Sequence, residues 1–217
     1  MPKLQQLPIA NSSFTSIRNL EQIYVDKTAL IYELARFNTS QYFLARPRRF
    51  GKSLLVSTLE SLFKDGLKMF HGLAIEKLWD ESRTYKVLRL DFSGIPCSSR
   101  EIFEKAAVRK FFLCAADAGL LDESCAPGDF HSISYLIDAI CRRCGENPFV
   151  LLVDEYDAPL AANADSPEKL AGIRQSLGYF YDAVKANSGS FRLVFITGTA
   201  GFGELVRMVR SSAVVDL

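Results

Sequence analysis

Gly51, Lys52 and Ser53 are the residues whose types and spacing most clearly suggest chemistry, because they follow a short apolar run and begin an apolar helix. A strand, a tight turn and a helix N-terminus form a phosphate-binding loop, in which N–H groups without intrahelical partners face an anion. Lys52 would offer its charge to the outer phosphates and Ser53 its hydroxyl to Mg²⁺. One position departs from the pattern G-x-x-x-x-G-K-[ST], since Arg46 and Pro47 stand at the first glycine and its neighbour. The plainer alternative is a helix start that happens to carry a lysine.

Asp154 and Glu155 form a second candidate group. They follow the apolar run Val150–Val153, which predicts a strand buried on both faces that ends at these acids. Open α/β sheets bind ligands at the carboxyl edge. Asp154 there could hold Mg²⁺, which favours one or two carboxylates with phosphate oxygens, and Glu155 could orient and deprotonate an attacking water. The alternative is a solvated strand end.

The pattern of apolar residues predicts the elements that position these groups. Strands are expected at about 41–44, 86–91, 149–153 and 191–197, with a fifth beginning near 214. Helices are expected at about 29–35, 52–65, 100–118, 133–144, 166–184 and 203–210. Ser98 and Glu101 match a capping box before the third of these helices. Alternating strands and helices indicate an α/β fold with a largely parallel sheet.

The composition is that of a globular domain. The chain has 217 residues, 48% hydrophobic and 24% charged, with a net charge of +1 that gives no overall nucleic-acid signature. We expect a single domain over residues 1–217. No apolar run is long enough to span a membrane, the N-terminus does not resemble a signal peptide, and the five cysteines are irregularly spaced. These features favour a soluble, cytoplasmic protein.

Several motifs in order make the chain resemble the AAA-ATPase-like family, from about residue 7 to the end. They are Leu7–Ile9, Tyr24–Thr28, Arg46–Leu55, Leu90–Ser93, Asp154–Asp157 with Pro159, and Ile196–Gly198. The resemblance implies a P-loop NTPase of the AAA type, a three-layer sandwich with parallel sheet order 5-1-4-3-2. It also implies Mg-dependent binding and hydrolysis of ATP, which would drive or switch a partner or an appended domain.

The resemblance further implies the roles of particular residues. Lys52 and Glu155 would be catalytic, and Ser53 and Asp154, the latter with Glu155 in the Walker B pair, would bind Mg²⁺. The nucleotide-binding set would comprise Arg46, Pro47, Arg48, Arg49, Phe50, Gly51, Lys52, Ser53 and Leu54, which form the Walker A loop, with Tyr24 and Asp26 near the adenine and Thr197 at the sensor position. ATP is favoured over GTP only through the resemblance.

Two features depart from the family pattern. Thr199–Gly203 replaces a Val-Ser-x-Phe-Ser-like turn, which leaves Thr197 or Thr199 as the sensor candidate. The chain also stops before any lid or the PD-(D/E)XK nuclease-like domain that such domains commonly precede, so it is expected to be either a segment of a longer protein or a stand-alone core. A homo-oligomer is a further expected partner arrangement, since ATPases of this type often need a neighbour's arginine.

The sequence leaves alternatives open for the arginines of the loop and for the function of the chain. Arg46, Arg48 and Arg49 could contact phosphates, pair with Asp157 or another acid, or be solvated. Cys141 and Cys144 are expected in the core rather than at a redox or zinc site. Two other functions compete with an ATPase: a nucleotide-binding regulatory module without turnover, and a nucleic-acid-binding module that uses the arginine-rich loop with Arg207 and Arg210.

Overall fold

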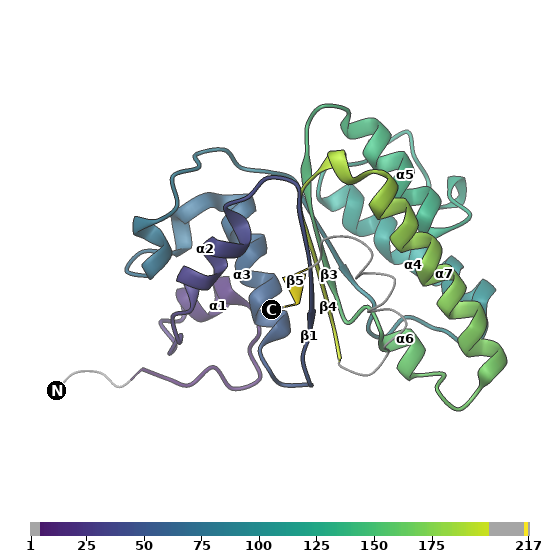
Figure 1. The fold of residues 1–217 in the computed structure, drawn as a ribbon, viewed down its shortest axis with the longest axis horizontal. Helices are drawn as coiled ribbons and strands as arrows, with labels where there is room; N and C mark the ends of the chain where they lie inside the picture. The colour runs from purple at the N-terminus through teal and green to yellow at the C-terminus, as the bar shows by residue number, and fades with distance from the viewer. Residues whose placement is uncertain (1–4, 200–214, 217) are drawn as a thin grey trace.

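The protein forms three layers in the computed structural model, which describes residues 5–199 and 215–216. A parallel sheet stands between helices on both of its faces (Figure 1). The strands are β1 (Ser40–Ala45), β2 (Val87–Asp91), β3 (Phe149–Asp154), β4 (Phe191–Gly198) and β5 (Val215–Asp216). The α-helices are α1 (Phe14–Asn19), α2 (Thr28–Ala35), α3 (Lys52–Asp65), α4 (Arg100–Asp117), α5 (Ile133–Cys144), α6 (Ala158–Ala161) and α7 (Pro167–Ala186). Short 3₁₀ turns are η1 (Gly66–Met69), η2 (Ala74–Lys77), η3 (Pro127–Asp129) and η4 (Ser188–Ser190).

The strand order is β2-β3-β4-β1-β5, and every pairing is parallel. The four long strands therefore stand in the order 1-4-3-2, as the corresponding part of the expected order requires. The fifth strand, expected to begin near 214, is β5, whose two residues pair with Tyr42 and Phe43 at the edge of the sheet. The helix expected near 203–210 lies outside the described residues, as do Arg207 and Arg210.

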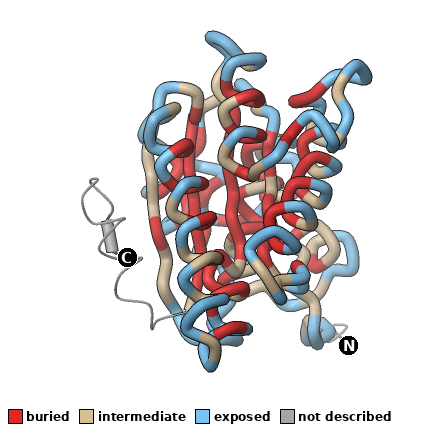
Figure 2. Tube along the Cα trace, turned by 90° about the vertical axis from the view of Figure 1, so that its right-hand side faces the viewer, coloured by how far each residue is buried: buried red, intermediate tan, exposed pale blue. Residues whose placement is uncertain are grey.

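Two hydrophobic clusters fill the spaces on either side of the sheet. Side chains alternate between the faces of a strand, so Val150 and Leu152 of β3 pack with α2 and α3, whereas Leu151 and Val153 pack with α4, α5 and α7. Figure 2 shows the buried residues along the central strands and the inward sides of the helices. Each of the residues of β3 and β4 is buried. A strand covered on both faces explains why these segments read as continuous apolar runs.

The structure differs from the sequence-based expectation at one helix cap and at two short helices. The cap of α4 is Ser99, whose side chain accepts from the amide of Ile102, so the capping box expected from Ser98 is wrong by one residue. The sequence patterns also missed α1 and the single turn α6, which are too short for a clear period. In the part of the chain that the structure describes, no helix combines the length and the apolar character needed to cross a membrane.

Candidate functional site

The loop between β1 and α3 has the backbone geometry that an anion requires. Arg49 and Gly51 both have left-handed conformations, with φ of 67° and 76°, and Phe50 between them has a negative φ. Backbone that alternates in this way turns successive N–H groups into one concavity. Gly51 is also the residue immediately before α3, so the free N–H groups of the first helical turn open at the same place. The loop therefore presents backbone donors to a negatively charged group.

Lys52 is held inside this loop rather than extended into solvent. Its side chain lies in a position only 4% exposed, and its Nζ donates to the carbonyl oxygens of Arg46, at 3.1 Å, and Pro47, at 3.2 Å. An ammonium group has three donors. Two of them are thus used within the loop, and the structure gives the third no acceptor among the described residues.

The remaining loop residues are more open. Arg46 is anchored by its backbone, whose amide donates to the carbonyl of Gly198 at 3.2 Å, and its guanidinium donates to the carbonyl of Ala45. Arg48, Arg49 and Phe50 are exposed, Phe50 by 67%. Ser53 and Leu54, in the first turn of α3, are half-buried. The structure thus brings every predicted loop residue to one edge of the sheet.

Asp154 lies at the carboxyl end of β3 and is 3% exposed. It shares a sheet face with Val150 and Leu152, against which α3 packs, so its side chain stands on the same side of the sheet as the phosphate loop's helix. Its Oδ1 accepts from the hydroxyl of Thr197 at 2.6 Å and from the amide of Glu155 at 3.1 Å. Two donors on one oxygen fix the carboxylate, and neither of these bonds uses Oδ2.

Thr197 reaches the site through Asp154. It is fully buried on β4, and its side chain is committed to the aspartate. The nucleotide contact expected of Thr197 from the sensor position stays a prediction.

Glu155 occupies a strained turn directly after β3. Its φ is 52°, which is uncommon for a residue with a side chain and costs free energy that the surroundings must supply. The side chain is half-buried, and in the described residues it makes no hydrogen bond or ion pair. The turn separates Asp154, on the α3 side, from Tyr156, which is 1% exposed in the opposite cluster. Glu155 is thus presented at the edge itself.

Asp157 ties this turn to the end of β4, a contact that sequence patterns did not anticipate. It is 3% exposed, and its Oδ2 accepts from the amide of Thr199 at 2.8 Å and from the hydroxyl of Thr199 at 2.5 Å. Gly198 is needed here, since a Cβ on it would lie 2.9 Å from Asp157 Oδ1. In the described residues no ion pair joins Asp157 to Arg48 or Arg49.

Tyr24 lies against the middle of α3, and Asp26 lies between α2 and η2. Tyr24 contacts Thr58 and stacks edge-on against Phe14, and burial raises the pKa of its hydroxyl. Asp26 Oδ1 accepts from the amide and hydroxyl of Thr28, and its Oδ2 accepts from the amide of Ala74 at 2.8 Å. Desolvation tends to raise the pKa of Asp26, but these hydrogen bonds outweigh it and the net direction is downward. Asp26 therefore joins the N-terminal segment to η2.

The oxygen ligands at this edge of the sheet are of the kinds that suit a Mg²⁺ ion bound to phosphate. In the described ranges no three His, Cys, Asp or Glu side chains gather as a metal cluster. The available ligands would be one hydroxyl, Ser53, and one carboxylate oxygen, Asp154 Oδ2, which suits an ion that takes its other ligands from phosphate and water.

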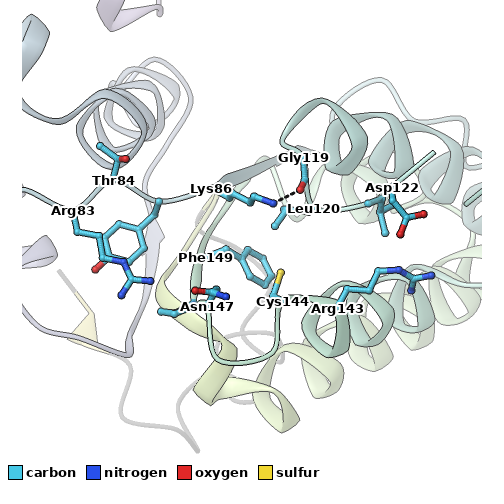
Figure 3. A pocket seen from close by; sticks show the side chains of 13 residues that line it. Arg83, Thr84, Lys86, Gly119, Leu120, Asp122, Arg143, Cys144, Asn147 and Phe149 are labelled. Atoms are coloured by element: carbon cyan, nitrogen blue, oxygen red, sulfur yellow. Dashed lines mark hydrogen bonds between the residues drawn. The ribbon is translucent and has the colours of Figure 1, made fainter. Parts of the chain in front are cut away.

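A pocket of about 520 Å³ opens at the opposite edge of the sheet, at the amino ends of β2 and β3. Arg83, Lys86, Asp122, Arg143 and Cys144 are among the residues that line it (Figure 3), and none of the predicted site residues does. Cys144 is half-buried beside this pocket and Cys141 is buried in the core, where desolvation raises its pKa to about 12. Cys141 thus lies in the core as expected, whereas Cys144 is only partly buried, packs against the core and lines the pocket.

Comparison with known proteins gives two findings. Residues 8–204 match a family of proteins described as "Predicted AAA-ATPase". The chain is also 32% identical over 202 residues to an "Uncharacterized protein in vnfD 5'region" from Azotobacter chroococcum mcd 1. That alignment covers 93% of this chain and 38% of the relative, so the chain spans well under half of the relative's length.

Proposed function

The chain belongs to the AAA-ATPase-like family, and from this premise we propose that it binds ATP with Mg²⁺ at the loop between β1 and α3 and hydrolyses it, in a P-loop NTPase fold. Family membership itself indicates ATP binding. The observation that carries the finer proposal is the buried carboxylate of Asp154, fixed by Thr197 on the sheet face that α3 covers. An acid held in this way beside a phosphate loop is the arrangement that nucleotide hydrolysis needs.

In this proposal the loop binds the phosphates through its backbone. The left-handed residues Arg49 and Gly51 direct N–H groups toward the anion, and the first turn of α3 adds its unpaired N–H groups. Lys52 keeps its two carbonyl contacts and directs its third donor to the outer phosphates. Arg48 and Phe50, which are exposed, would contact the nucleotide from outside.

Ser53 and Asp154 would hold Mg²⁺, which when bound neutralises charge on the outer phosphates. Asp154 offers Oδ2, since its Oδ1 is occupied by Thr197 and Glu155. Thr197 is a positioning residue in this arrangement. It keeps the carboxylate in one orientation.

Glu155 would act on the attacking water. Its carboxylate accepts a proton from the water as the water oxygen bonds to the γ-phosphorus, and the bond from that phosphorus to the leaving oxygen breaks. The strained φ of 52° holds the side chain at the edge, where it is half-buried and has no partner in the described residues. A carboxylate without a protein partner is available to a water.

The adenine of ATP would lie beside the N-terminal segment that contains Tyr24 and Asp26. Tyr24 is a half-buried aromatic residue against α3. Both carboxylate oxygens of Asp26 accept hydrogen bonds within the protein. We therefore infer that Asp26 keeps the Tyr24 segment in place and does not contact the adenine itself.

Two variants test the proposal. Lys52→Ala should abolish nucleotide binding. Glu155→Gln should keep nucleotide binding and lose phosphate release, because only hydrolysis needs the carboxylate of Glu155 as a general base. Binding is measured by calorimetry with a non-hydrolysable ATP analogue and Mg²⁺, and turnover by phosphate release. If Lys52→Ala binds as tightly as the parent, the site is elsewhere.

The competing functions are outcomes of the same experiment. Binding without phosphate release above that of Glu155→Gln identifies a regulatory module that does not turn over. Retention on DNA or RNA at low salt, lost when Arg48 and Arg49 are replaced, identifies a nucleic-acid-binding module. The homo-oligomer, the appended nuclease-like domain and the cytoplasmic location stay predictions.

A further inference from the structure

Arg89 of β2 reaches across the sheet face toward the candidate metal carboxylate. It pairs in register with Leu152 of β3, and Leu152 and Asp154 project from the same face because they are two residues apart. Its Nη2 lies 4.0 Å from Asp154 Oδ2, while its Nη1 donates to Glu60 Oε2 at 2.9 Å. The guanidinium therefore stands between an acid of β3 and an acid of α3.

The oxygen that Arg89 faces is the one available for a cation. Asp154 Oδ1 already accepts from Thr197 and Glu155. For Oδ2 the structure gives one partner among the described residues, Arg89, at a distance beyond hydrogen bonding. A divalent cation that binds Oδ2, directly or through water, would therefore feel the positive charge of Arg89 at close range.

Glu60 restrains Arg89 from closing this gap. It lies on α3 seven residues after Ser53, which places both on nearly the same side of the helix. The short contact of 2.9 Å goes to Glu60 and the long one of 4.0 Å to Asp154. Without Glu60, the guanidinium would be free to turn onto Asp154 Oδ2 and compete for it.

We propose that Arg89 and Glu60 together set the affinity of the Asp154 site for a divalent cation, Arg89 by opposing the cation and Glu60 by holding Arg89 away from the carboxylate. This inference rests on the proposed function, since it takes Asp154 and Ser53 to receive a cation together with the nucleotide. Neither residue of the pair is a catalytic residue. Both are positioning residues that act through Asp154.

Removal of the two charges should have opposite effects. Arg89→Gln removes a repelling charge and should tighten cation binding about three- to tenfold, given one unit charge near the cation and partial screening of side chains 33% and 29% exposed. Glu60→Gln should weaken binding by a similar factor, because Arg89 can then pair with Asp154. A merely structural role would weaken binding in both variants. Arg89→Lys keeps the charge and should stay near the parent.

The experiment titrates Mn²⁺ into the 217-residue chain saturated with a non-hydrolysable ATP analogue, with free Mn²⁺ followed by electron paramagnetic resonance. Thermal unfolding of each variant without nucleotide checks that it folds. Tighter binding in Arg89→Gln with weaker binding in Glu60→Gln supports the inference. A change in the same direction in both, or a change below twofold in both, overturns it.

The failure of the proposed function gives a different result. If the parent with the analogue binds no more Mn²⁺ than Lys52→Ala does, both the proposed function and this inference fail. If binding depends on Lys52 but is indifferent to Arg89 and Glu60, the inference fails and the proposed function stands.

Discussion

Thr197→Val tests whether a single hydroxyl holds the candidate metal carboxylate. The Thr197 hydroxyl donates to Asp154 Oδ1 at 2.6 Å, and the two residues are 0% and 3% exposed. Valine has nearly the shape of threonine, so the change removes the donor with little cavity. A hydrogen bond to a charged group contributes about 1.5–3 kcal/mol, and the amide of Glu155 still serves the same oxygen, so we expect a loss of about 2 kcal/mol. For a chain of this size that lowers Tm by about 4–8 °C.

The assay is urea and thermal unfolding without nucleotide, so it does not depend on the proposed activity. Thr197→Ser keeps the hydroxyl and serves as the matched control, with a smaller loss expected. A double-mutant cycle with Asp154→Asn isolates the contact, because a neutral acceptor weakens the bond. Thr197→Val should therefore cost about 1 kcal/mol less in the Asn background. An equal loss in both backgrounds, or stability of Thr197→Val within about 0.5 kcal/mol of the parent, would refute the reasoning.

Three further perturbations follow from other contacts. Gly198→Ala should destabilise the protein by about 1–3 kcal/mol in urea unfolding, because its Cβ would lie 2.9 Å from the fixed carboxylate of Asp157. Arg192→Met should cost about 3–5 kcal/mol in the same assay, since it removes a guanidinium 4% exposed that donates to two carbonyls and to Glu81. Asp26→Asn should destabilise at pH 7, and the difference from the parent should shrink as the pH falls below about 3.9. The folded pKa of Asp26 lies below the unfolded value of about 3.9, so its stabilisation is present above that value and is lost as the pH falls through the folded pKa.

Matched variants give these predictions their controls. Gly189→Ala adds a Cβ with no atom within 4 Å and should be nearly neutral, so an equal loss there would contradict the steric argument for Gly198. Arg36→Met removes an exposed pair with Glu33 and should change stability by less than about 0.5 kcal/mol. A cost for Arg192→Met no larger than this would show that burial does not govern the pair. A pH-independent effect of Asp26→Asn would show that its charge is immaterial.

Much of the fold was predictable because its signals are local. The apolar runs at β3 and β4 are continuous, since both faces of each strand are covered, and they identified the central strands to within one or two residues. The helices α5 and α7 were recognised from their apolar stripes, whereas α4 was predicted from the capping pattern before it. The missed elements, α1 and α6, are too short to repeat a period. The cap was expected at Ser98 because Glu101 follows three residues later, whereas the actual cap, Ser99, is followed at that spacing by Ile102.

Some residues of the candidate site were likewise predictable from local sequence, and others were not. Gly51, Lys52, Ser53, Asp154 and Glu155 were recognisable from residue type and order, because a phosphate loop and an acid at a strand end are set by neighbours in the chain. Arg89 and Glu60 carried no such signal. They are 29 positions apart in the sequence. They meet because β2 lies beside β3 in the sheet and α3 packs on the face from which Arg89 projects.

The sequence by itself thus determined which residues could bind phosphate and metal, and that a parallel sheet would carry them to one edge. Only the tertiary structure decided how they are held: Lys52 bound by loop carbonyls, Asp154 fixed by Thr197, and Gly198 close against Asp157. The physical reason is that composition and periodicity report burial and backbone preference, which are properties of neighbours. A hydrogen bond between strands depends on register, and register is set only when the sheet assembles.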